Sequence, residues 1–275
     1  MFSASRLAPS TQMATTHVDI HTFVWLDHES VGLPLGHARA LELFRDSVLR
    51  PSLKALDQEI EANQRSEDPA ADFFTGDLED LYQATVEGYI LTVQSMWERA
   101  LRGLLIHRDK KLFGGQRLKA IQRDPWSSEK GPTLQAHFAW MLGVPPNAFD
   151  AFEDLDLLQN LGSAIRHGDG NAAKKVHELA PSLWWNWLPP GGAVQAGPFN
   201  FAVPADWPPH PSFNKVTLTQ QVLEQMVQSV VQFWTDLELM RCNSFKNKHE
   251  STQRWLDEWP AERALRASKR LWTAG

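Results

Sequence analysis

The sequence predicts a mainly α-helical protein, an antiparallel helical bundle with a small aromatic β-hairpin or loop excursion. Apolar residues recur every three to four positions over residues 77–107 and again over residues 219–241, which is the period of an amphipathic helix. A stretch rich in Trp, Pro and Gly at 183–203 supplies the excursion. Shorter periodic segments predict further helices at 37–64, 132–142 and 152–167.

Length and composition suit one large folded domain with appendages. The chain has 275 residues, of which 43% are hydrophobic and 22% charged, so a sizeable core can form. The formal net charge of −6 argues against a broad, non-specific binder of nucleic acid or anionic membranes. The 12 tryptophans predict either a strongly aromatic core or a surface that faces a partner.

Three features of the sequence indicate where the protein works. The single cysteine, Cys242, allows no intramolecular disulfide, which fits a reducing compartment. The N-terminal stretch lacks the continuous apolar segment of a secretory signal. No run of about 18 apolar residues occurs that would span a membrane. We therefore expect a cytoplasmic protein with no membrane partner.

The sequence pattern divides the chain into three parts. Residues 1–36 form an N-terminal extension, residues 37–242 the helical domain, and residues 243–275 a charged C-terminal extension with helical character. The last part carries three tryptophans that would either dock it onto the domain or contact a protein partner: Trp255, Trp259 and Trp272.

Local signals set the expected limits of the helices. Pro51 predicts a kink or a break within residues 37–64. The polar stretch 64–76 predicts a loop, after which Asp77 would cap the longest helix. Residues 217–220 resemble a capping box at the start of the last long helix.

Two charged groups each have a functional and an ordinary interpretation. Glu98 and Arg102 stand four residues apart on the longest helix and form either a surface ion pair or part of a site. The basic stretch 108–131 would either contact phosphate groups or serve as a solvated connection between helices.

Three stretches have the composition of short strands. Residues 17–25 alternate weakly, residues 183–203 suggest two strands around the turn 189–192, and residues 215–218 suggest one more. The first stretch begins a cluster of potential metal ligands: His17, Asp19, His21, Asp27 and His28. No second ligand group with a recognisable spacing accompanies the cluster, so neither a metal site nor a cofactor is assigned.

The most ordered polar pattern lies on the helix expected at 152–167. Gly168 is suited to end this helix, and Asp169 or Asn171 to cap the next one. Four side chains, spaced four, three and four residues apart, fall on one narrow stripe: Asp156, Asn160, Ser163 and His167. A carboxylate, an amide, a hydroxyl and an imidazole in a row make this helix the candidate site.

The end of that helix resembles a stretch of the HEPN-like helical proteins of prokaryotes. The resemblance rests on Ala164-Ile165-Arg166-His167-Gly168-Asp169-Gly170, on Trp97-Glu98 in the longest helix, and on the later helix near Phe233-Trp234. It spans residues 77–240, and its specific part is short.

The resemblance implies a bundle of antiparallel helices that is often a homodimer and often a metal-independent endoribonuclease, in defence or toxin–antitoxin systems. In active members the arginine and histidine of an RxxxxH motif act on the scissile phosphate, and the ribose 2′-OH is the nucleophile. His167 matches the histidine, but Gly162 stands where the motif has its arginine. The phosphate contact would then fall to Arg166, to Arg99 or Arg102, or to an arginine of a second copy.

Two hypotheses of different classes follow. In the first, the chain is a binding or interaction module that keeps the fold with the catalytic arginine lost. In the second, it is an endoribonuclease with RNA as its partner, His167 as general acid or base and Arg166 as the phosphate contact. The remaining polar residues would bind or orient: Asp156, Asn160, Ser163, Asp169, Glu98 and Arg102.

Overall fold

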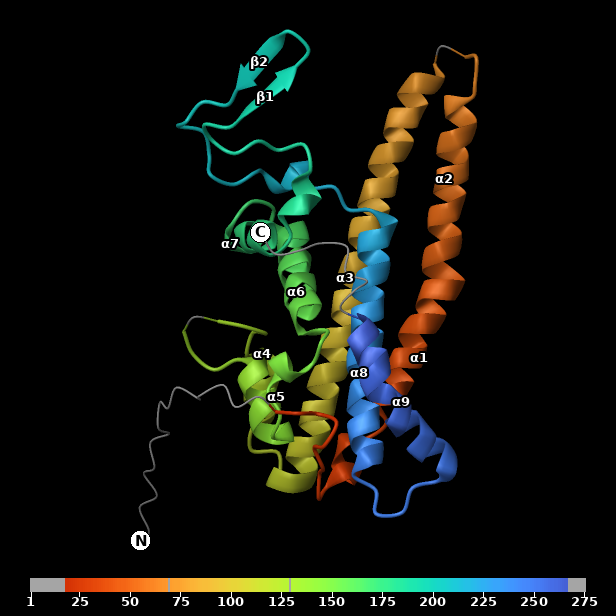
Figure 1. Ribbon diagram of the computed structural model, residues 1–275, viewed down its shortest axis with the longest axis vertical. Coiled ribbons are helices and arrows are strands. Elements are labelled where there is room, and N and C mark those ends of the chain that lie inside the picture. The colour runs from red at the N-terminus through yellow and green to blue at the C-terminus, as the bar shows by residue number, and fades with distance from the viewer. Residues whose placement is uncertain (1–17, 69, 129, 267–275) are drawn as a thin grey trace.

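The computed structural model describes residues 18–68, 70–128 and 130–266, and it confirms a mainly α-helical chain with one small hairpin (Figure 1). The strands β1 (Ala193–Ala196) and β2 (Phe199–Ala202) pair antiparallel. The helices are α1 (Pro34–Phe44), α2 (Arg50–Gln64), α3 (Ala71–Phe113), α4 (Leu118–Arg123), α5 (Leu134–Leu142), α6 (Phe152–His167), α7 (Asn171–Leu179), α8 (Gln220–Asn243) and α9 (Glu250–Arg266).

The core lies where the two longest helices, α3 and α8, run side by side (Figure 1). After α2 the chain turns back, so that α3 packs along α2. Helix α1 packs on α8, and α6 packs against both α3 and α8. Trp97, Phe233 and Trp234 are fully buried between these helices, with the rings of Trp97 and Phe233 6.2 Å apart. Part of the high tryptophan content is therefore explained by an aromatic core.

A kink or break is expected at Pro51. The structure instead has one π-helical turn just before it, between α1 and α2. Residues Arg45–Leu49 form a wide turn in which the Arg50 N–H donates to the Arg45 carbonyl, five residues back. Pro51 is the second residue of α2, in backbone that is already helical at Leu49 and Arg50. The widened turn makes room for the proline ring, so the chain continues as a helix from α1 into α2.

The longest helix extends further at both ends than its periodicity predicts. The loop expected over 64–76 is mostly wrong, because α3 begins at Ala71, and Asp77 lies within the helix rather than at its cap. Asp68 accepts a hydrogen bond from the Ala70 N–H at 2.9 Å, and Ala71 is buried. The turn that Asp68 makes with Ala70 and Ala71 thus starts the helix inside a segment whose composition favours a loop.

The hairpin forms, but its turn is not the one expected. The strands meet at Gly197, whose φ of 61° suits glycine, while the Pro-Gly stretch lies at the open end. There the Val203 N–H donates to the Gly192 carbonyl at 2.8 Å.

The two other expected strands are absent from the described residues. Residues 18–25 form turns, because the Asp19 carboxylate accepts from the His21 N–H at 3.0 Å and so folds the chain locally. Lys215 ends a 3₁₀ turn. In the residues after it, the Thr217 N–H donates a single backbone hydrogen bond to the Leu183 carbonyl, which does not make a strand.

Both extensions pack on the bundle within the described residues. Trp25 is buried, its backbone N–H donates to Ser244 Oγ at 2.8 Å, and its ring N–H donates to the Leu142 carbonyl at 2.7 Å. Trp259 of α9 is 1% exposed, whereas Trp255 is half-buried. Trp272 lies outside the described residues. Among the described helices, none has the length and apolar composition required to cross a bilayer.

Candidate functional site

The polar stripe expected on α6 forms, but its first half serves packing. The Trp126 ring N–H donates to Asp156 Oδ1 at 3.0 Å, which ties the α4–α5 connection to α6. The Asn160 amide donates to the Asp156 carbonyl one turn back, at 2.8 Å. Ser163 is half-buried further along the same helix. Asp156 and Asn160 thus satisfy local structure and leave little of the row free for a substrate.

Gly162 lies buried where α6 meets α3. A Cβ atom at this position would lie 2.3 Å from Gln94 Oε1 and 2.6 Å from Gln94 Cδ. Gln94 is 3% exposed and is held from two sides, because its Nε2 donates to Gln159 Oε1 at 2.9 Å and its Oε1 accepts from Arg166. The space that an arginine of the RxxxxH motif would need beside the helix is therefore filled by an amide from α3.

The side chains of Arg166 and His167 point to different places: Arg166 contacts Gln94 of α3, and His167 is exposed. The Arg166 guanidinium turns back onto Gln94, as just described. His167 is exposed in the last turn of α6, and within the described residues no hydrogen bond or ion pair connects its ring to an arginine. Gly168, with a φ of 68°, ends the helix directly after it. The described chain by itself does not pair the two expected catalytic groups.

Asp169 anchors the segment that leads into α8 and is not the cap of α7. Its Oδ1 accepts from the Phe213 N–H at 2.5 Å and its Oδ2 accepts from Ser212 Oγ at 2.8 Å. The backbone bond from Phe213, followed by the Ser212 hydroxyl, lowers the pKa of the Asp169 carboxyl. Asn171 is the first residue of α7, and no side-chain cap bond begins that helix.

Glu98 and Arg102 form the ion pair expected from their spacing. Arg102 Nη2 lies 2.7 Å from Glu98 Oε1, and both side chains are partly buried. The same guanidinium donates to the Ile121 carbonyl and, at 3.0 Å, to the Asp124 carbonyl. Arg102 therefore closes the C-terminal end of α4, and it is not available to substitute for the missing arginine.

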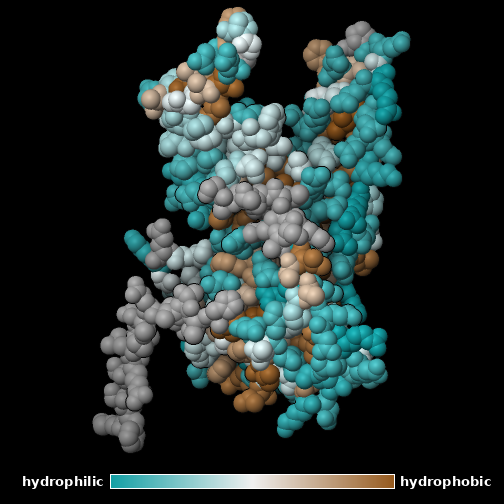
Figure 2. All heavy atoms as spheres, viewed as in Figure 1, coloured by the Kyte–Doolittle hydropathy of each residue, from teal (hydrophilic) through white to brown (hydrophobic). Residues whose placement is uncertain are grey.

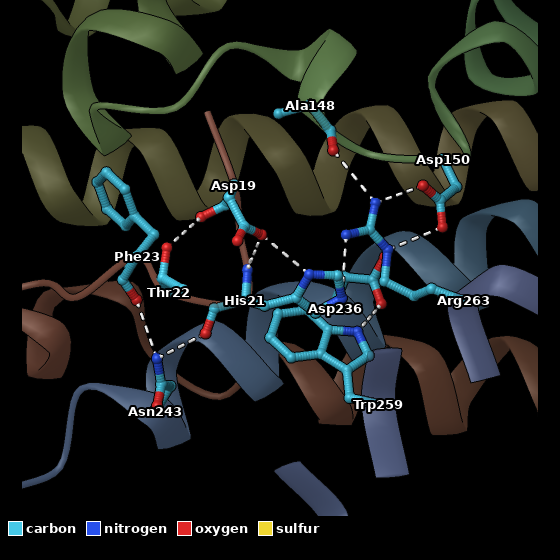
Figure 3. A network of polar contacts seen from close by, with 10 residues as sticks. All are labelled: Asp19, His21, Thr22, Phe23, Ala148, Asp150, Asp236, Asn243, Trp259 and Arg263. Atoms are coloured by element: carbon cyan, nitrogen blue, oxygen red, sulfur yellow. Dashed lines mark hydrogen bonds and ion pairs between the residues drawn. The ribbon is translucent and has the colours of Figure 1, made fainter. Parts of the chain in front are cut away.

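A separate polar network joins Asp19 and His21, two of the potential ligands in the sequence, to Arg263, a partner that the sequence did not indicate (Figure 3). It lies along a cleft of about 960 Å³ between the N-terminal segment, the α5–α6 connection and α9. Asp19 Oδ1 lies 2.9 Å from His21 Nδ1, and His21 Nε2 lies 3.4 Å from Arg263 Nη1. Arg263 also donates to Asp150, with its Nε 2.8 Å from Oδ2. The His21 backbone N–H, more than its ring, lowers the pKa of Asp19.

The hydrogen bonds assign a tautomer to His21. Because a guanidinium can only donate, His21 Nε2 accepts from Arg263 and His21 Nδ1 carries the proton that Asp19 receives. The ring edge also packs on Trp259, with centroids 4.6 Å apart. With both ring nitrogens in contact with charged partners, His21 connects the N-terminal segment to α9.

Asp236 of α8 belongs to the same network and binds two side chains of α9. The carboxylate is fully buried, and burial raises its pKa, while bonds from α9 favour the charged form. Trp259 Nε1 donates to it at 2.8 Å, and Arg266 Nη1 lies 2.8 and 2.9 Å from its two oxygens. The network thus fastens α9 to the bundle through one buried charge.

The remaining sequence candidates also have structural roles. Burial raises the pKa of the Cys242 thiol to about 11, so this cysteine is not a nucleophile at neutral pH. In the basic stretch, Arg108 is 4% exposed and pairs with Asp27 at 2.9 Å. The Arg117 guanidinium lies over the Trp140 ring, 3.7 Å from its centroid.

The histidine–aspartate cluster near the N-terminus does not converge in the described residues. Asp27 is used by Arg108, whereas Asp19 and His21 face Arg263. His17 lies outside the described residues. Within them, no group of three or more His, Cys, Asp or Glu side chains is arranged to hold a metal ion.

Comparison of the chain with protein-family models, with curated proteins and with solved structures finds no match in any of the three.

Proposed function

We propose that the chain is a non-catalytic, HEPN-like binding module that acts in the cytoplasm by contacting a partner, in the defence or toxin–antitoxin setting that the resemblance implies. The observation that carries the proposal is the packing of Gln94 against Gly162. Since Gln94 is buried and bonded on two sides, the position of the motif arginine is committed to the core of the bundle.

A contact surface is supplied by the excursion that contains β1 and β2. Among the described residues its two strands pair only with each other, and the hairpin stands clear of the bundle (Figures 1 and 2). An isolated two-stranded hairpin is marginal in water, and exposed aromatic groups mark interaction sites. Between 45% and 75% of each of these apolar residues is exposed: Trp185, Val194, Phe199, Phe201 and Trp207.

The register explains why one face of the hairpin is apolar. Val194 pairs with Phe201 and lies on the same face as Phe199, whereas Gln195 pairs with Asn200 on the other face. The Phe199 and Phe201 rings lie 6.3 Å apart. We propose a second copy of this chain as the partner of this face, because the resemblance implies a homodimer.

The alternative function is a metal-independent endoribonuclease with His167 as general acid or base. One observation favours it, which is that His167 is exposed at the end of α6, where a substrate could reach it. An arginine from a second copy would then have to supply the phosphate contact.

Cleavage of RNA separates the two functions. Total RNA would be incubated in EDTA with the wild type, with His167→Ala and with His107→Ala, an exposed histidine of α3. The binding module predicts no cleavage above the protein-free control for all three proteins. Cleavage by the wild type and His107→Ala that is lost in His167→Ala would overturn the proposal and establish the endoribonuclease.

A further inference from the structure

Two histidines that no sequence motif connects face each other beside the excursion. His177 lies on α7, and His210 lies in the segment between β2 and α8. Their Nδ1 atoms are 3.5 Å apart, and the ring planes are nearly perpendicular, at 84°. Both residues are half-buried, so the pair is neither sealed in the core nor free in solvent.

The separation of the nitrogens is informative. A strong hydrogen bond to nitrogen or oxygen has its heavy atoms at about 2.7–3.2 Å, so 3.5 Å is long for a bond between the two rings. Two imidazole nitrogens bound to one tetrahedral metal ion, each at about 2.0–2.1 Å, stand about 3.3–3.4 Å from each other. The observed pair is close to that distance.

Rigid surroundings hold each ring in place. The His177 ring packs edge-on against Trp184 and Trp187, with centroids 5.4 and 4.9 Å away. His210 is bracketed by prolines, which restrict the backbone on both sides. Two residues further on, Ser212 is bonded to Asp169. The two nitrogens are therefore pre-positioned by a helix on one side and by an anchored loop on the other.

The open space beside the pair lies on its His210 side, and His177 does not line it. A hollow of about 330 Å³ lies against His210, lined in part by Asp169, Lys174 and Ser212. Burial, and then the neighbouring His210, lower the pKa of His177. Glu178, the residue after His177, acts on it electrostatically and pairs with Lys175 at 3.2 Å, while Asp169 and Lys174 line the hollow beside His210.

We propose that His177 and His210 form a two-imidazole site for a divalent transition-metal ion such as Zn²⁺, with water completing its coordination. Imidazole favours Zn²⁺, Cu²⁺ and Ni²⁺ over Mg²⁺ and Ca²⁺, which take oxygen ligands. Since the described residues bring no third His, Cys, Asp or Glu to the pair, the site is weaker than a structural zinc site and remains open to a further ligand.

Calorimetric titration with ZnCl₂ tests the site in the tag-free full chain. The wild type is expected to bind one equivalent of Zn²⁺ and no Mg²⁺. His210→Ala is expected to bind at least about ten-fold more weakly, because the loss of a ligand costs no less than the loss of an outer-shell partner. His107→Ala, which removes an exposed histidine elsewhere, serves as the matched control and should bind like the wild type.

Tryptophan fluorescence gives a second measurement that locates the ion. Cu²⁺ bound at the pair would quench Trp184 and Trp187, and the quenching should be lost in His210→Ala, whose fold is checked by circular dichroism. The proposal fails if the wild type binds no Zn²⁺ or if His210→Ala binds it as tightly as the wild type. Neither result depends on whether the chain cleaves RNA.

Discussion

At the scale of single residues, Gly162 decides how α6 approaches α3. A glycine in a helix interior usually costs about 0.5–1 kcal/mol relative to alanine. Here the missing side chain lets the buried Gln94 amide lie directly against the α6 backbone, where it connects Gln159 and Arg166. Glycine at position 162 is therefore a packing requirement of this bundle.

Gly162→Ala should lower the free energy of unfolding by about 1–3 kcal/mol, because the new Cβ displaces Gln94 and breaks its buried hydrogen bonds. Gly103→Ala is the matched control, since an added Cβ there meets no atom within 4 Å, and it should stabilise the chain by about 0.5–1 kcal/mol. Urea denaturation measures both changes. In a Gln94→Ala background the penalty at 162 should disappear. Equal stabilisation by the two glycine substitutions would contradict this explanation.

At the scale of elements, helix interiors follow the sequence pattern more closely than helix ends do. The capping box expected at residues 217–220 is wrong. The helix α8 begins at Gln220, and its cap is Thr219, two residues after the expected cap Thr217. Thr219 Oγ1 accepts from the Val222 N–H at 3.3 Å, whereas the Thr217 backbone is bonded to Leu183. The bond to Leu183, in the distant 3₁₀ turn Pro181–Trp184, uses the Thr217 N–H outside the helix, and α8 starts three residues later.

Thr219→Ala should destabilise the chain by about 1 kcal/mol through loss of the α8 cap. Thr217→Ala tests the position that the sequence favoured and should have a smaller effect. Thermal or urea unfolding of the two variants measures the difference. A larger loss for Thr217→Ala would show that the capping box, rather than Thr219, begins the helix.

At the scale of the whole molecule, the bundle is closed on the side of α9 and carries an open apolar surface on the excursion. Asp236, Trp259 and Arg266 fasten α9 to α8. The hairpin has no such cover within the described residues, and its phenylalanines are more than half exposed. Of the tryptophans, Trp259 docks α9 on the bundle, whereas Trp185 and Trp207 are exposed.

If a second copy covers the hairpin, the wild type should sediment as a dimer and the double variant Phe199→Ser/Phe201→Ser as a monomer, because the apolar face is lost. Leu26→Ser is the matched control, since Leu26 is 99% exposed and lies in the N-terminal segment, outside the hairpin, and it should leave the dimer intact. Sedimentation velocity at several concentrations measures the result. A wild type that stays monomeric, or a dimer that survives the double substitution, would exclude the hairpin as the self-association surface.

The amino-acid sequence by itself determined the helical class, the approximate extent of the long helices and the existence of a hairpin, because periodicity and turn composition are local properties. It also located the Glu98–Arg102 pair, whose partners are one helical turn apart. Tertiary structure alone decided which distant polar groups meet. His21 and Arg263 are 242 positions apart, and Gly162 depends on a glutamine from another helix. Such contacts are set by how the helices pack, and no spacing along the chain encodes them.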